Sequence, residues 1–225
     1  MLKELPLTIT RSQRKTLVIY IRNNQVEVRA PMKAPQSWID EFIERKRPWI
    51  LKKLELQQQK HEERLKFEDG EAVLYCGKPY FLKLTQGENS IKLEGERLHI
   101  QARQLDETYL KKQFQQWLLQ AAKAEFEPRV WQIASMMGLD GQIEAVKFRK
   151  TKTKWGHCTT KGVLQFNPLL MMAPKSVQDY LIIHELCHLK YMNHSKRFWQ
   201  LVATNCPDYQ ESEQWLKEHG HKVWC

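Results

Sequence analysis

Apolar and polar residues alternate along much of the first hundred residues, in the pattern that is typical of β-strands. The segment 17–28 alternates on both sides of an Asn-Asn pair, which predicts a β-hairpin. Glycines punctuate two further alternating segments, 71–84 and 90–101, so we expect strands there as well. Between the hairpin and these strands, residues 36–64 have apolar positions at helical spacing. This spacing predicts one helix that is kinked or restarted at Pro48.

From Asp106 onward, the apolar positions recur every three to four residues instead of every two. This period predicts a long helix that passes Pro128 and continues to Met137. Two short strand patterns follow at 145–148 and 163–166, on either side of a Trp-Gly turn. The second half of the chain is therefore expected to combine helices with a small sheet.

The change of period divides the chain into two expected domains. Residues 1–103 are expected to form a β-rich N-terminal module with one helical excursion, and residues 104–225 a second domain. With 225 residues and 42% hydrophobic content, the chain can bury a core of ordinary size. The expected fold class is therefore α+β.

A histidine-rich segment in the second domain carries the candidate chemistry. His184 and His188 are four residues apart, so on a helix they project from one face and can bind one metal ion. Glu185 lies on the adjoining flank, where its carboxylate can act as a general base toward water. We expect the helix to end near Asn193, which lets His194 turn back as the third ligand.

Three histidine ligands point to a catalytic rather than a structural metal site. They leave the fourth tetrahedral position to water, which is the open arrangement of catalytic zinc, and we therefore predict one Zn²⁺ per chain. The alternative interpretation is that these are ordinary histidines on a helix surface. Three of them at this spacing, with a glutamate between the first two, favour the zinc site.

The residues around this motif extend it to a longer pattern. KWGHC stands at 154–158, HELCHLKYMNHSKRFW at 184–199 and CPDYQESEQWLKEHG at 206–220, and RPWILKK stands near the start at 47–53. Together these segments resemble the YgjP-like metallopeptidase family, which is related to the WLM and SprT-like zincins. The resemblance implies a β-rich N-terminal module followed by a minimal zincin-like metallohydrolase domain with an HExxH active-site helix. It also implies a peptide or protein substrate, and a substrate strand that pairs with the strand above the metal helix.

The resemblance leaves two features of the site open. Where the family has WGSC, this chain has a histidine, and His157 is either a solvent-facing turn residue or a donor to a developing oxyanion. Tyr191 and Tyr209 are further candidates for that donor role. Related zincins can also take the third ligand from a later helix, so Glu211 and Glu213 are alternative ligands.

Composition predicts a soluble cytoplasmic protein without a membrane segment. No apolar run approaches the roughly 18 residues that a spanning helix needs, and the first residues lack the apolar centre of a secretion signal. The five cysteines are scattered, contain no CxxC pair and are odd in number. This pattern favours reduced thiols over a disulfide framework.

The chain is strongly basic, and this charge is compatible with functions other than peptide hydrolysis. Its net charge is +10, and one basic run, from Lys147 to Lys154, leads into the predicted Trp-Gly turn. The field of such a surface attracts anions, so nucleic acid is a possible partner. Besides a zinc metallopeptidase, the sequence is compatible with a metal-dependent hydrolase of nucleotide phosphoanhydrides or other anionic esters. A third candidate is a DNA-associated, SprT-like protease or nucleic-acid-tethered protein, although no DNA-binding motif is visible. The sequence gives no indication of the oligomeric state.

Overall fold

The computed structural model describes residues 7–22, 24–62, 64–151 and 153–223. The chain forms two compact units, one up to Arg64 and one from Leu65 onward. The sequence had placed the domain boundary at 103/104 instead. The boundary differs because the strands between 72 and 102 share a hydrophobic core with the helices that follow them, and not with the first sheet.

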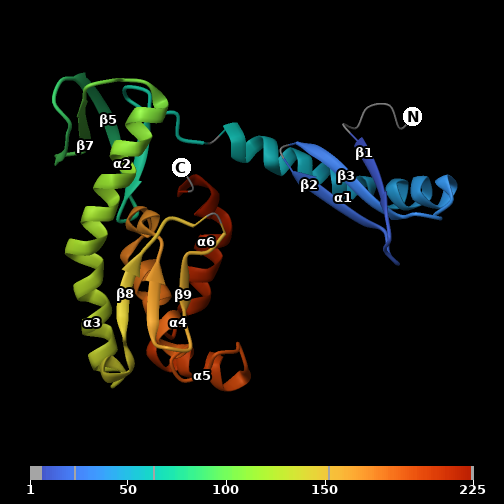
Figure 1. The fold of residues 1–225 in the computed structure, drawn as a ribbon. Coiled ribbons are helices and arrows are strands. Elements are labelled where there is room, and N and C mark those ends of the chain that lie inside the picture. Colours follow the sequence, from blue (N-terminus) through green and yellow to red (C-terminus); the bar gives the residue numbers. More distant parts are fainter. Residues whose placement is uncertain (1–6, 23, 63, 152, 224–225) are drawn as a thin grey trace. The chain divides into compact units, whose positions relative to one another are not determined.

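Unit 1 packs one long helix against a three-stranded sheet (Figure 1). Strands β1 (Leu7–Ser12), β2 (Val18–Arg22) and β3 (Gln25–Pro31) lie in the order β1-β3-β2. Strands β2 and β3 form the predicted antiparallel hairpin, whose turn residue Asn23 is outside the described residues, and β1 adds to β3 in parallel. Helix α1 (Gln36–Glu62) continues through Pro48 without a break. Most of the buried core comes from apolar residues of β3 and α1: Val26, Val28, Ala30, Ile39, Ile43 and Ile50.

Unit 2 begins with a four-stranded sheet. It contains β4 (Ala72–Tyr75), β5 (Lys78–Gln86), β6 (Ser90–Glu94) and β7 (Arg97–Ala102), in the order β4-β5-β7-β6. Each of the two predicted strand segments is thus a hairpin of two shorter strands. Both hairpins turn at a glycine with left-handed backbone angles, Gly77 (φ 77°) and Gly95 (φ 59°).

The long helix predicted after Asp106 is confirmed, with one irregular turn in its middle. Helix α2 (Glu107–Ala121) and helix α3 (Glu127–Met136) are joined by a π-helical turn over Ala122–Phe126, and Figure 1 shows them as one green helical column. The carboxylate of Asp106 caps α2 by accepting the backbone N–H of Tyr109 at 3.0 Å. Pro128 lies in the first turn of α3, directly after the π-helical turn.

A second, three-stranded sheet lies beside the helix that carries the histidines. Strands β8 (Ala145–Phe148) and β10 (Val163–Phe166) form as predicted, and β9 (Gly156–Cys158) occupies the expected Trp-Gly turn. Their order is β8-β10-β9, so β9 is an outer strand, and it contacts α4. A short 3-10 helix, Pro168–Met172, leads into α4 (Lys175–Cys187), which α5 (Lys196–Asn205) and α6 (Tyr209–Val223) follow.

Helix α4 is buried on most of its surface and ends earlier than expected. Its last helical residue is Cys187 and His188 is its C-cap, whereas the sequence predicted an end near Asn193. Cys187 is fully buried, as expected for a small apolar residue in the core. None of the described helices is both long enough and apolar enough to cross a membrane.

Candidate metal centre

Three histidine rings meet at the end of α4. His184 belongs to its last turn, His188 is its C-cap, and His194 follows in the segment before α5. One ring nitrogen from each lies within 4.8 Å of the others, and the Nε2 atoms of His184 and His194 are 3.1 Å apart. The structure therefore brings together the three side chains that the sequence spacing selected.

The surroundings hold these rings in a form that can bind a cation. Nδ1 of His188 lies 2.9 Å from the carbonyl oxygen of Tyr191, and an N–H at that position leaves the Nε2 lone pair free. Nδ1 of His184 lies 3.5 Å from the hydroxyl of Tyr180. Burial, helped by the two neighbouring rings, lowers the pKa of His184 to about 3, and burial also lowers the pKa of His188. Both rings are therefore neutral at pH 7, as metal binding requires.

Aromatic side chains from α5 fix the orientation of two of the rings. The ring of Phe198 stacks on His188 with centroids 4.5 Å apart, and Trp199 stacks on His194 at 5.7 Å. Ser195 caps α5 by accepting the backbone N–H of Phe198 at 3.4 Å, which begins the helix directly after His194. The third histidine is thus positioned by the start of α5.

Glu185 lies on the flank of α4 that faces β9. Its side chain is buried, with 5% exposed, and its carboxylate accepts a hydrogen bond from the backbone N–H of Cys158. Burial raises the pKa of Glu185 to about 8, while the positive charge of Lys154 and the Cys158 hydrogen bond act in the opposite direction. A cation held by the three histidines would favour the ionised carboxylate further.

The four residues predicted from the sequence line one cavity of about 300 Å³. Sequence reasoning had singled out His157 as a possible neighbour, and it does line this cavity. The sequence pattern included Lys154 only in a basic run, and it indicated no role for the backbone of β9. The lining residues are Lys154, Gly156, His157, Cys158, His184, Glu185, His188, Met192 and His194.

The other predicted candidates lie outside this cavity. Tyr191 contributes its carbonyl to His188, while Tyr209 stacks on Trp199 with centroids 5.3 Å apart. Glu213 interacts with the hydroxyl of Tyr180, and Glu211 lines a different cavity. The alternative third ligands are therefore not part of the histidine cluster.

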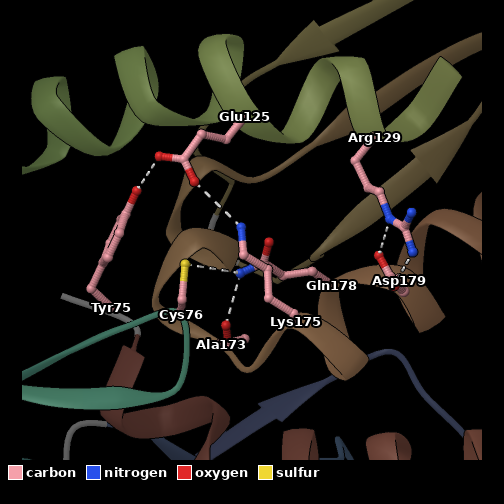
Figure 2. A network of polar contacts seen from close by, with 8 residues as sticks. All are labelled: Tyr75, Cys76, Glu125, Arg129, Ala173, Lys175, Gln178 and Asp179. Atoms are coloured by element: carbon pink, nitrogen blue, oxygen red, sulfur yellow. Dashed lines mark hydrogen bonds and ion pairs between the residues drawn. The ribbon is translucent and has the colours of Figure 1, made fainter. Parts of the chain in front are cut away.

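A larger cavity, of about 530 Å³, lies on another face of α4 and contains none of the three histidines. Beside it, Asp179 binds the guanidinium of Arg129 through two hydrogen bonds of 2.9 and 2.7 Å (Figure 2). Figure 2 also shows Glu125 between Tyr75 and Lys175. Its carboxylate accepts hydrogen bonds from the Tyr75 hydroxyl at 2.7 Å and from Nζ of Lys175 at 3.4 Å. These pairs connect α4 with α3 and with the π-helical turn, whose Glu125 also binds Tyr75 at the end of β4.

Comparisons with known proteins found a family model that matches most of the chain and solved structures that resemble part of it. The family model of the YgjP-like metallopeptidase domain matches residues 15–219. The crystal structure of the metallopeptidase zymogen abylysin from Pyrococcus abyssi is 24% identical, with a TM-score of 0.37, over 41% of this chain and 93% of that one. The zymogen of Methanocaldococcus jannaschii jannalysin is 22% identical, with a TM-score of 0.37, over 42% of this chain and 95% of that one. No curated protein matches the chain.

Proposed function

Because the chain belongs to the YgjP-like metallopeptidase family, we propose that it is a zinc-dependent peptidase. In this proposal His184, His188 and His194 hold one Zn²⁺, and Glu185 is the general base. The single observation that carries it is the convergence of three ring nitrogens within 4.8 Å, beside a buried carboxylate.

The donor set fits zinc better than a hard cation. Zinc prefers imidazole nitrogens, whereas magnesium and calcium prefer oxygen ligands. The Nε2 atoms of His184 and His194 are 3.1 Å apart, and a ring nitrogen of His188 lies within 4.8 Å of the other two ligand atoms, so all three side chains can reach a common point.

The chemistry follows from the groups that face the cavity. Bound zinc would acidify a coordinated water and polarise the carbonyl of the scissile peptide bond. Glu185 accepts a proton from the attacking water and then delivers it to the nitrogen of the departing amine. The C–N bond breaks, and a carboxylate and an amine are released. Lys154 and His157 line the same cavity and are the candidate donors to the charge that develops on the carbonyl oxygen.

The neighbouring sheet suggests how a substrate is held. Strand β9 lines the cavity and is an outer strand of its sheet, so one of its edges is available for pairing. An extended peptide that adds to this edge makes backbone hydrogen bonds, which hold it without demanding a particular sequence. We therefore propose a peptide or unfolded protein segment as the substrate.

The test is hydrolysis of casein and of a fluorogenic peptide library by the purified protein. We expect activity with one equivalent of zinc, loss of activity with a chelator, and recovery when zinc is added back. A zinc-loaded protein that cleaves none of these peptides would contradict the proposal.

Hydrolysis of nucleotide phosphoanhydrides or other anionic esters is the second candidate. It is favoured by Lys154 and His157, which make the cavity wall basic. Nucleoside triphosphates are therefore assayed in parallel, with the same chelator control, and release of phosphate without peptide cleavage would favour this alternative.

Association with DNA is supported only by the net charge of +10. Stimulation of peptide cleavage by DNA would support it.

A further inference from the structure

Strand β9 passes so close to Glu185 that position 156 has no room for a side chain. A Cβ atom placed on Gly156 would lie 2.7 Å from Cγ and 2.8 Å from Cδ of Glu185. Carbon atoms in favourable contact are about 3.5–4.0 Å apart, so such a Cβ would overlap the glutamate. The three nearest atoms all belong to Glu185. Gly156 is not among the glycines with positive φ, so the backbone itself would accept an alanine.

The backbone of β9 also supplies a hydrogen bond to this carboxylate. Cys158 is two residues after Gly156, so its side chain lies on the face of β9 from which a side chain at 156 would project. The backbone N–H of Cys158 donates to Glu185, while its buried thiol has a pKa raised to about 11 by burial and by the glutamate charge. Pairing with β10 holds both residues in place, since Cys158 pairs with Leu164 and Gly156 with Phe166.

We propose that Gly156 is a positioning residue for Glu185. Without a side chain at 156, the strand backbone can approach the carboxylate closely enough for the Cys158 N–H to orient it toward the cavity. This inference rests on the proposed role of Glu185 as general base. An alanine at 156 would push Glu185 into another rotamer or move β9 away from it, and either change would misplace the base.

The first test measures the contact between position 156 and Glu185 by a double-mutant cycle, with the melting temperature Tm as the measured quantity. The wild type, Gly156→Ala, Glu185→Ala and the double variant are unfolded in the presence of a chelator. Gly156→Ala should lower Tm by about 5 °C when Glu185 is present, the usual cost of overpacking. With Glu185→Ala the space is open, and the same substitution should change Tm by about 1 °C or less.

Gly141→Ala is the matched control, because a Cβ atom placed on Gly141 would meet no atom within 4 Å and this glycine has no positive φ. Its effect on Tm should be the same in both backgrounds. If Gly156→Ala alone does not fold, recovery of folding in the double variant supports the inference. An equal loss of Tm in both backgrounds, or failure of both variants to fold, would overturn it.

The second test asks whether the contact positions the base. With zinc, Gly156→Ala should retain one equivalent of metal and lose about 10²-fold in kcat, with little change in KM. In the Glu185→Gln background the same substitution should cost no further activity. Additive losses in the two backgrounds would overturn the positioning role. The Tm cycle needs no peptidase activity, so a wild type that cleaves no peptide refutes the proposed function while the cycle still decides the contact.

Discussion

Helix α4 carries two sets of polar side chains that are stabilised in different ways. On one face, Asp179 and Lys175 each have a specific partner in the chain, the guanidinium of Arg129 and the carboxylate of Glu125 (Figure 2). On the other face, the pKa values of His184 and Glu185 are shifted mainly by burial. Ionisable groups whose pKa values are shifted strongly by burial, and which lie together in a cavity, are typical of a functional site. The following variants separate the two faces.

The largest expected effect is loss of the metal from the histidine face. His188→Ala removes one of three ligands, so we expect the purified variant to lose stoichiometric zinc and all peptidase activity. Elemental analysis after dialysis measures the zinc. Arg129→Met, on the other face, should retain one equivalent. If His188→Ala kept a full equivalent of zinc, the proposed ligand set would be wrong.

The next effect is loss of turnover without loss of metal. Glu185→Gln keeps the shape of the side chain but cannot accept a proton, so kcat should fall by about 10²–10⁴-fold. Zinc content and circular dichroism should be those of the wild type. Asp179→Asn makes the same chemical change on the opposite face, and its kcat should stay within about twofold of the wild-type value. Wild-type kcat in Glu185→Gln would refute the assignment of the base.

These two variants target residues that the sequence alone identified, and the reason is geometric. The positions of His184, Glu185 and His188 relative to one another follow from helical periodicity, which does not depend on the rest of the fold. His194 was expected to turn back, and it does, although α4 ends at Cys187 instead of near Asn193. The residues after His188 contain no glycine or proline before Asn193, so the pattern held no signal for the earlier end.

Features that depend on distant contacts were not predictable in the same way. Strand β9 has only three residues, Gly-His-Cys, which is too short for an alternating pattern and weak in β-propensity. Its contribution to Glu185 comes from a backbone N–H, which any residue but proline supplies, so residue types could not reveal it. The unit boundary near Arg64 likewise depends on which helices the second sheet packs against.

A smaller effect should come from a residue that supports a ligand without belonging to the cavity. The hydroxyl of Tyr180 lies 3.5 Å from Nδ1 of His184 and also interacts with Glu213. Partners of this kind orient metal-binding histidines, and their loss typically weakens metal affinity by about 10–100-fold. We expect Tyr180→Phe to lower zinc affinity by about tenfold, measured by competition with a chromophoric chelator. Unchanged affinity would mean that the ring of His184 is held by packing alone.

The smallest effect should appear on the ion-paired face. Arg129→Met removes both hydrogen bonds to Asp179, but the two side chains are partly exposed and water screens their charges. We expect the free energy of unfolding to fall by about 1 kcal/mol, measured by urea denaturation with a chelator present. Zinc affinity should not change. A large loss of zinc affinity in this variant would show that the two faces of α4 are coupled.

The shortness of β9 has a consequence for how the protein behaves at high concentration. An exposed strand edge is a template for pairing with other copies of the same chain, and long apolar edges lead to aggregation. This strand offers three residues, of which one is a glycine and one an exposed histidine. Such a short edge favours a partner that gains additional contacts in the adjoining cavity. It offers few backbone hydrogen bonds to a second copy of the chain.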